Sequence, residues 1–416
     1  SDLPVLVPLI HSSVDDPERF WNVIKQTLRP QIIVASNGFG EDAIGSCMAQ
    51  KLVRAFPQAD VTAFPLVGRG EHYSEKGIRA IGPLSMSPSG GIIKYHLKDL
   101  LSDVKAGLLR HILKQFACWK EIRRCCRTVI CVGDAYMLCH ALWGQGKKPL
   151  LIATAKTQLI SGHWRLENFL YRKACRKVWT RDEATAAELC KAGVNAVFEG
   201  NPIMDLHDES GERRTEWGTG RRILLLPGSR PRAYKDLQLL LDTLRLLSER
   251  VSVSAVMVVA PTLSAQKIAE CADGWHFENG RLTCGSVSIQ VVSDDLSACA
   301  AGAELLIGLA GTANQVCAGM GIPVLSIKEK GKFVQKKLLG DSELLVDPTP
   351  ESLAHAAFEL LNEPQLLQRM GEAGKERLGR SGTLDAVIAY VSEQLGWKGR
   401  CLLYEKIRAA NPAQRS

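Results

Sequence analysis

The feature that most constrains this chain is a repeated alternation of short apolar runs with longer amphipathic stretches. Continuous apolar runs of this length are typical of parallel strands that are buried on both faces. In the first half we expect strands at 31–36, 60–66, 128–134, 149–154 and 177–182. In the second half we expect them at 222–230, 254–261, 287–292, 304–312, 322–327 and 343–348. The alternation predicts right-handed βαβ crossovers, and hence an α/β fold with a doubly wound sheet in each half.

A length of 416 residues fits two domains better than one. The stretch 207–222, HDESGERRTEWGTGRR, is polar and contains glycines, so it is the best candidate for a linker. We therefore expect a Rossmann-like domain over 1–206, a second one over 223–396 and a tail over 397–416. The two domains are expected to face each other across a cleft, with ligands at the carboxyl ends of the strands.

The composition narrows the range of partners and compartments. A net charge of +8 favours an anionic partner, but no zinc-finger spacing, RNP motif or basic helix-turn-helix pattern predicts nucleic-acid binding. The thirteen cysteines include no CxxC pair, which indicates reduced thiols and no structural zinc. No apolar run is long enough to cross a bilayer, and residues 1–10 lack the basic start of a signal peptide. We expect a cytoplasmic or organelle-stroma protein, and the oligomeric state stays open.

Two turns in the second half have the character of phosphate-binding loops. LPGSR at 226–230 ends a strand with exposed amides, and its residues Gly228, Ser229 and Arg230 suit a diphosphate. AGTANQ at 310–315 places small residues at the start of a helix, whose N-terminal amides and dipole attract phosphate. The candidate nucleotide-binding residues of this second turn are Gly311, Thr312, Ala313, Asn314 and Gln315. An ordinary strand-to-helix turn and a plain N-cap at Thr312 are the alternative readings.

These motifs carry a resemblance to a known family. LPGSR, EGNPIMD at 199–205 and AGTANQ occur in the order and at distances compatible with the GT-B glycosyltransferases. Within them the chain is similar to lipid-A-disaccharide synthase over about residues 30–396. The resemblance implies a nucleotide-sugar donor, UDP-linked, bound to the second domain. Two departures are an asparagine, Asn201, where the family has histidine, and Gln315 and Val316 near the position of a family glutamate.

The first half is expected to hold the acceptor and a general base. Transfer with inversion needs a group that takes the proton of the acceptor hydroxyl. Asp134, at the end of the expected strand 128–134, is the first candidate, although it could equally be a helix N-cap. Glu41 and Asp42, in SNGFGEDAIG, are the second candidates, with stabilisation of a helix dipole as the alternative. No metal or other cofactor is expected, because basic side chains and helix dipoles can offset the departing diphosphate.

Residues 90–127 form a basic amphipathic stretch with nine Lys and Arg against three Asp and Glu. Leucines and aromatic residues recur along it at helical spacing. Such a helix can lie on an anionic membrane and supply a lipid acceptor. The alternative is that its apolar stripe faces the domain core.

The function expected from the sequence is metal-independent transfer of a sugar from a nucleotide diphosphate to a lipid-like or other hydroxyl acceptor, with inversion. An epimerase or hydrolase of the same fold and a non-catalytic binding or scaffold protein are the alternatives. A dinucleotide oxidoreductase is disfavoured, because the glycines at 38 and 40 are followed by two acids instead of the G-x-G-x-x-G spacing.

Overall fold

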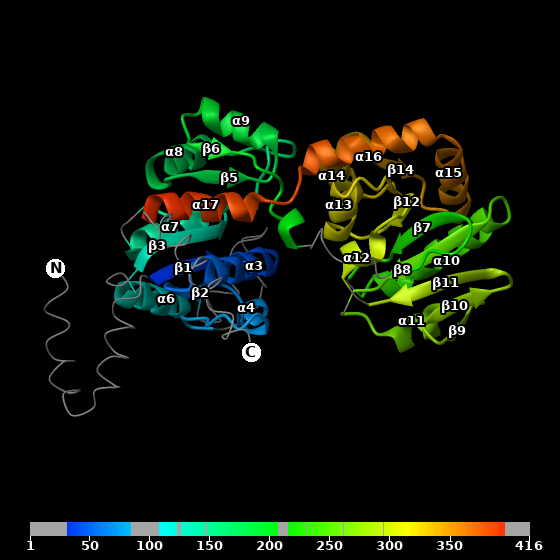
Figure 1. The fold of residues 1–416 in the computed structure, drawn as a ribbon, viewed down its shortest axis with the longest axis horizontal. Coiled ribbons are helices and arrows are strands. Elements are labelled where there is room, and N and C mark those ends of the chain that lie inside the picture. Colours follow the sequence, from blue (N-terminus) through cyan, green and yellow to red (C-terminus); the bar gives the residue numbers. More distant parts are fainter. Residues whose placement is uncertain are drawn as a thin grey trace, which may run out of the picture.

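A computed structural model of the chain describes residues 31–84, 108–122, 126–145, 148–206, 215–229, 231–260, 262–293 and 295–395. These residues form two α/β domains that lie side by side (Figure 1). The expected α/β class with two Rossmann-like domains is confirmed. Each sheet has hydrophobic residues on both faces, as doubly wound sheets require.

The first domain is built on a parallel sheet with the strand order β2-β1-β3-β4-β5-β6. The strands are β1 (Gln31–Ser36), β2 (Asp60–Pro65), β3 (Cys126–Gly133), β4 (Leu150–Ala153), β5 (Val178–Thr180) and β6 (Ala196–Val197). The helices are α3 (Phe39–Ala55), α4 (Glu71–Glu75), α6 (Leu108–Ile122), α7 (Ala135–Gln145), α8 (Arg165–Ala174) and α9 (Glu183–Lys191). Helices α6 and α7 pack on one face of this sheet and α3 packs on the other.

The second domain has the strand order β14-β13-β12-β7-β8-β11-β10-β9, in which the β9–β10–β11 edge is antiparallel. The strands are β7 (Arg221–Leu226), β8 (Val253–Val258), β9 (His276–Glu278), β10 (Arg281–Cys284), β11 (Val287–Val292), β12 (Leu305–Gly308), β13 (Val324–Ile327) and β14 (Glu343–Val346). The helices of this domain are α10 (Ala233–Ser248), α11 (Ala265–Cys271), α12 (Leu296–Ala300), α13 (Thr312–Gly319), α14 (Lys330–Leu339), α15 (Pro350–Asn362) and α16 (Pro364–Leu378). The antiparallel β9 and β10 were not expected from the sequence.

In each sheet the strand order reverses next to the first strand of the domain. In the first domain this switch point lies between β1 and β3, where Ser36 is in register with Val132. In the second it lies between β7 and β12, where Leu226 is in register with Gly308. The loops that follow these strands therefore leave the same edge of their sheet, which is where open α/β sheets bind ligands.

The last helix, α17 (Thr383–Leu395), crosses back and packs on the first domain (Figure 1). Leu384, Val387 and Val391 join the same core cluster as residues of β1 and α3. The sequence had assigned this segment to the second domain, and the structure places it on the first. A local pattern cannot reveal this, because an amphipathic helix fits any apolar surface of matching shape.

The segment 199–206 holds α17 in place. The carboxylate of Asp205 accepts hydrogen bonds from the backbone amides of Gly382 at 2.8 Å and Leu384 at 3.4 Å. Gly200 has a φ of 115°, and a Cβ there would lie 2.0 Å from the carbonyl oxygen of Arg380. Only glycine allows this close approach of the two chain segments. The EGNPIMD motif thus has a structural role at the crossing between the domains.

The described part of the basic stretch 90–127 packs largely inward. Trp119 and Gln115 of α6 are fully buried, and Phe116 packs against the same core cluster. The indole of Trp119 donates a 2.8 Å hydrogen bond to His140 on α7. The alternative reading, an apolar stripe that faces the core, therefore holds for this part of the helix. Residues 90–107, which carry the rest of the predicted stripe, lie outside the described residues.

Candidate functional site

A pocket of about 660 Å³ opens at the switch point of the second sheet. It is lined by the turn after β7, by the turn from β12 into α13 and by the first turns of α14. Among the predicted nucleotide-binding residues, Gly228, Ser229, Gly311, Thr312 and Ala313 line this pocket. The structure thus brings the two predicted phosphate loops together on one cavity.

The geometry of both loops favours an anion. Gly228 has a φ of 110°, a left-handed conformation that side chains rarely adopt, and it turns the chain after Pro227. The carbonyl of Ser229 accepts a 2.8 Å hydrogen bond from Thr262, which fixes the loop against the segment that follows β8. Arg230 lies outside the described residues. Across the pocket, α13 begins without a side-chain cap, so its first amides are available to a ligand.

Asn314 and Gln315 do not line the pocket. Asn314 is fully buried, and its side-chain amide donates a 2.9 Å hydrogen bond to the carbonyl of Gly308 at the end of β12. This bond explains why the expected strand 304–312 ends at Gly308, where the chain turns into α13. The side-chain oxygen of Gln315 instead accepts a 3.1 Å hydrogen bond from Arg181 of the first domain. The predicted nucleotide-binding role of Asn314 is therefore replaced by a structural one.

Two described residues that line the pocket carry a positive side chain, Arg232 and Lys332. The Arg232 guanidinium forms ion pairs with Asp236 and Glu329, so its charge is offset. Lys332 is only 6% exposed, and its ammonium donates to the carbonyl of Ala310. No regular sequence pattern distinguished Lys332 from the other lysines of the EKGKFVQKK stretch.

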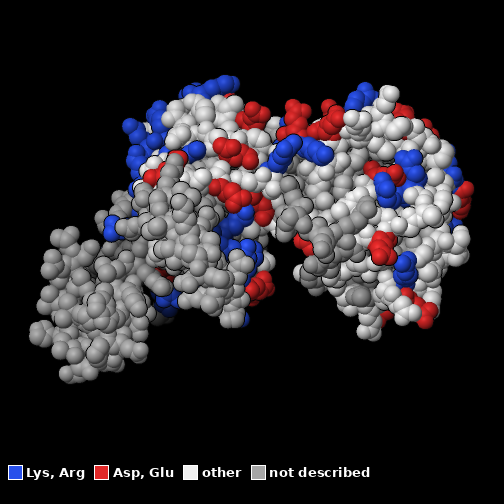
Figure 2. Space-filling model, viewed as in Figure 1, with Lys and Arg blue, Asp and Glu red and all other residues white. Residues whose placement is uncertain are grey.

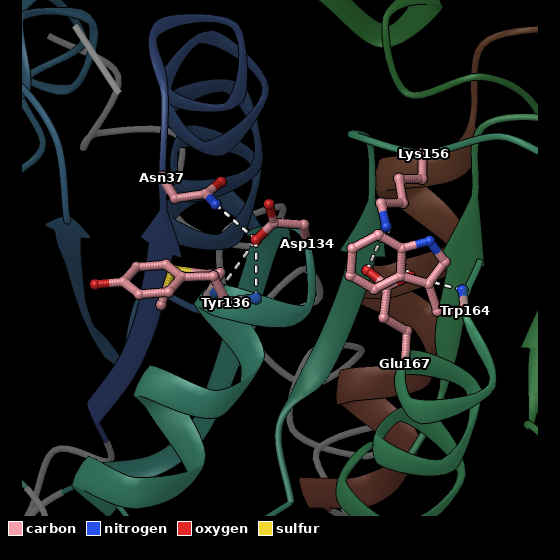
Figure 3. A network of polar contacts seen from close by, with 7 residues as sticks. Asn37, Asp134, Tyr136, Lys156, Trp164 and Glu167 are labelled. Atoms are coloured by element: carbon pink, nitrogen blue, oxygen red, sulfur yellow. Dashed lines mark hydrogen bonds and ion pairs between the residues drawn. The ribbon is translucent and has the colours of Figure 1, made fainter. Parts of the chain in front are cut away.

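At the switch point of the first sheet, Asp134 is held by three hydrogen bonds. Its Oδ1 accepts from Asn37 Nδ2 at 2.8 Å and from the amides of Tyr136 at 3.0 Å and Met137 at 3.3 Å (Figure 3). The two amide bonds make Asp134 the N-cap of α7, as its alternative reading predicted. All three bonds use Oδ1, and among the described residues no hydrogen bond to Oδ2 occurs. A half-buried carboxylate with one oxygen open can accept a proton.

Glu41 and Asp42 lie in the first turn of α3 and point in different directions. Glu41 is half-buried and accepts a 3.2 Å hydrogen bond from the hydroxyl of Thr154, which follows β4. Asp42 is 2% exposed and accepts a 2.6 Å hydrogen bond from Ser36, which also bonds the hydroxyl of Tyr73. Burial raises the pKa of Asp42 to about 6. Because Asp42 faces the interior, it cannot meet an acceptor hydroxyl in this conformation.

Arg181, which sequence reasoning missed, joins the two domains. Its guanidinium donates to the carbonyl of Thr154 at 3.0 Å and to the side chain of Gln315 at 3.1 Å. Burial lowers the pKa of Arg181, while the carboxylates of Asp182 and Glu41 act in the opposite direction. The sequence could have pointed to Arg181, because this residue lies at the carboxyl end of the expected strand 177–182, where α/β sheets bind ligands. Arg181 therefore places a cation between the predicted acids of the first domain and the first turn of α13.

No three His, Cys, Asp or Glu side chains cluster as a metal site would require, as far as the described residues extend. The same part of the chain contains no helix that is long and apolar enough to cross a membrane.

Comparisons with solved structures identify the arrangement of the two domains. The MnaA–UDP co-structure of S. aureus aligns with 88% of this chain and 97% of its own, at a TM-score of 0.58 and 13% identity. The structure of UDP-GlcNAc 2-epimerase from Neisseria meningitidis bound to UDP-GlcNAc aligns with 87% of this chain and 100% of its own, at a TM-score of 0.55 and 11% identity. The structure of CalG4, the calicheamicin glycosyltransferase, aligns with 88% of this chain and 99% of its own, at a TM-score of 0.52 and 12% identity. The chain has the GT-B fold.

No protein-family model matches the chain, and no curated protein sequence matches it either. At these identities the structural likeness establishes the fold, and the activity has to be argued from the site. The resemblance to lipid-A-disaccharide synthase, which rests on three short motifs, stays a prediction.

Proposed function

We propose that this protein is a GT-B glycosyltransferase that binds a nucleotide-diphosphate sugar, UDP-linked, in the pocket of the second domain. The observation that carries the proposal is the pocket between the turn after β7 and the uncapped start of α13. The pocket has a volume of about 660 Å³, typical of small-ligand sites, and its charged lining, among the described residues, consists of the buried Lys332 and of Arg232 paired with Asp236 and Glu329. A diphosphate suits such a lining, because amides at a helix start and a lysine both stabilise negative charge.

The first domain would supply the acceptor site and the base. Asp134 directly follows β3 at the switch point of the first sheet, and its Oδ2, which accepts no hydrogen bond from the described residues, would receive the proton of an acceptor hydroxyl. Attack by that hydroxyl on the anomeric carbon breaks the bond to the diphosphate and inverts the configuration. The negative charge on the leaving diphosphate would be stabilised by the α13 amides and Lys332.

A thermal-shift panel of UDP, GDP, dTDP and ADP tests the donor site. We expect UDP at millimolar concentration to raise the melting temperature, because a ligand that binds only the folded state stabilises it. If none of the four nucleotides shifts the melting temperature, the donor-site proposal fails and a non-catalytic scaffold becomes the better account.

A UDP-sugar 2-epimerase is the second candidate, since solved structures of such enzymes share the fold. The two activities differ in their need for an acceptor. Incubation with UDP-GlcNAc alone, followed by NMR of the sugar, separates them. Conversion to a new UDP-sugar, or release of UDP at a rate comparable to transfer, would overturn the transferase proposal.

For a lipid acceptor, the surface around α8 supports membrane contact better than α6 does. Trp164, Leu166 and Phe169 are 71%, 66% and 47% exposed. Arg172 lies 5.7 Å from the Phe169 ring centroid, whereas Lys156, which lies 4.3 Å from the Trp164 ring centroid, is ion-paired with Glu167 (Figure 3). Lys and Arg gather over α8 and α9 in Figure 2. Exposed aromatic residues beside basic ones suit an anionic bilayer surface.

Cosedimentation with vesicles of phosphatidylcholine and phosphatidylglycerol tests this contact. We expect binding that high salt weakens and that the Trp164→Ser, Phe169→Ser double variant largely loses. The matched control is Leu344→Ser, which removes an exposed apolar side chain from the second domain. Equal vesicle binding by the wild type and the double variant would exclude α8 as the contact.

A further inference from the structure

Beneath the pocket of the second domain lies a buried polar chain of three residues. The ammonium of Lys332 donates a 3.2 Å hydrogen bond to Gln335 Oε1, and Gln335 Nε2 donates a 2.9 Å hydrogen bond to Glu343 Oε1. Lys332, Gln335 and Glu343 are 6%, 6% and 1% exposed. A charged pair at this depth costs free energy, so its presence needs a reason beyond stability.

The lysine end of this chain faces the ligand side. Lys332 and Gln335 both line the pocket, whereas Glu343 does not. The ammonium also donates to the carbonyl of Ala310, the residue directly before Gly311 and the start of α13. This bond fixes the backbone directly before α13 and places a positive charge beside the start of that helix.

The carboxylates of Glu343 and Glu329 act on Lys332 without direct contact. Among the described residues no carboxylate lies within ion-pair distance of its ammonium, because Gln335 stands between it and Glu343. Glu343 Oε2 is itself buried and has no hydrogen-bond partner in the described residues. Burial lowers the pKa of Lys332 and raises that of Glu343, and the attraction between the two groups offsets this effect only in part. An anion in the pocket would stabilise the charged form of the lysine.

We propose that Lys332 is the diphosphate-binding cation of the donor site, and that Gln335 and Glu343 position it through the buried chain. This inference rests on the proposed function and deepens it. It predicts that the site recognises the phosphates of the donor more strongly than its nucleoside part.

The test compares UDP with uridine. Titrations follow UDP by calorimetry and uridine by ligand-observed NMR, for the wild type, Lys332→Met, Glu343→Gln and a control, Lys328→Met. Lys328 is four residues away on the same segment, but it lies outside the pocket lining and pairs with the exposed Asp347. We expect Lys332→Met to weaken UDP binding by about 10-fold to 100-fold, the loss typical of one charge-assisted hydrogen bond, and to leave uridine binding nearly unchanged.

Glu343→Gln tests the buried chain through its pH dependence. It keeps the hydrogen bond from Gln335 but removes a carboxylate whose charge raises the pKa of Lys332, so the lysine should lose its proton at a lower pH. UDP binding by this variant, relative to the wild type, should therefore weaken as the pH rises from about 6 to about 8. A packing defect would weaken UDP binding by the same factor at both pH values. Lys328→Met should bind UDP as the wild type does.

The outcomes separate this inference from the proposed function. If the wild type binds UDP and Lys332→Met binds it equally well, the inference fails and the donor site stands. A parallel loss of UDP and uridine binding in Lys332→Met would assign the lysine a purely structural role and also overturn the inference. If the wild type binds no nucleotide, the proposed function itself fails.

Discussion

The two domains share one architecture but differ in the chemistry at their switch points. In the first, the loops after β1 and β3 are joined by the bond between Asn37 and Asp134, and the nearby charged groups are the carboxylates of Asp134 and Glu41 and the guanidinium of Arg181. In the second, the loops after β7 and β12 line one pocket together, and the charged residues of its described lining are Arg232, Asp236, Glu329 and Lys332. Below the first switch point lies a buried acid, Asp42, and below the second a buried base, Lys332.

This difference indicates how one fold can divide a reaction between two halves. Carboxylates repel a diphosphate and suit a hydroxyl, whereas helix amides and a lysine suit the diphosphate. The sheet order determines only where the loops meet. The side chains on those loops decide which part of a substrate each half can hold.

The largest effect is expected from Asp134→Asn. Asparagine can still cap α7, but it cannot accept a proton, so turnover should fall by about 10²-fold to 10⁴-fold. UDP affinity and the melting temperature should stay close to the wild type. Steady-state kinetics and calorimetry check both parts. Turnover within a fewfold of the wild type would show that Asp134 is not the base. It would also contradict the proposal that the first domain activates the acceptor while the second binds the diphosphate.

The buried acid of the first domain gives a pH-dependent prediction. The pKa of Asp42 is raised to about 6 in the folded chain from about 3.8, so the folded chain retains this proton over the interval in which the unfolded chain has lost it. The free energy of unfolding should therefore fall as the pH rises from about 4 to about 6. Asp42→Asn should remove this dependence and be more stable than the wild type at pH 7, by on the order of 2 to 3 kcal/mol.

Urea unfolding at about pH 4.5 and about pH 7 measures this difference. Asp60→Asn, which changes an acid with an exposed side chain on β2, is the control. If the free energy of unfolding of Asp42→Asn differs from that of the wild type by the same amount at both pH values, burial does not raise the pKa of Asp42 in the folded chain.

A pair of glycine variants compares the two helix starts directly. Gly40 lies at the start of α3 in the first domain, and Gly311 lies at the start of α13 in the second. A Cβ at either position would meet nothing within 4 Å. Gly311→Val should place its side chain in the phosphate position and weaken UDP binding by about tenfold, the cost of roughly one displaced hydrogen bond. Gly40→Val should leave UDP binding unchanged. If both variants bind UDP equally, the phosphates do not approach α13.

The smallest effect is expected from the contact between the domains. Arg181→Lys keeps the charge but loses the planar fork that spans Thr154 and Gln315, so the coupling between the domains should fall by about 1 kcal/mol. A double-mutant cycle with Gln315→Leu, read out as kcat/KM, measures this coupling. Additive effects of the two variants would mean that the observed contact does not contribute to turnover.

The amino-acid sequence by itself determined most of the parallel strands, the two-domain fold and the two glycine-containing turns that line the pocket. These features follow from local patterns, because a strand buried on both faces must be apolar along its length and a tight turn near an anion needs small residues. The expected strand after residue 304 ended too late, since the bond from Asn314 to Gly308 is a tertiary contact.

Only the tertiary structure decided which polar residues meet. It turned Asp42 inward, joined Arg181 to Gln315 across the domains, returned α17 to the first domain and buried Lys332 behind the α13 turn. Each of these depends on segments far apart in the chain. The sequence shows that a side chain can be charged or apolar, but its partner depends on which surfaces pack together, and that is fixed only when the whole chain has folded.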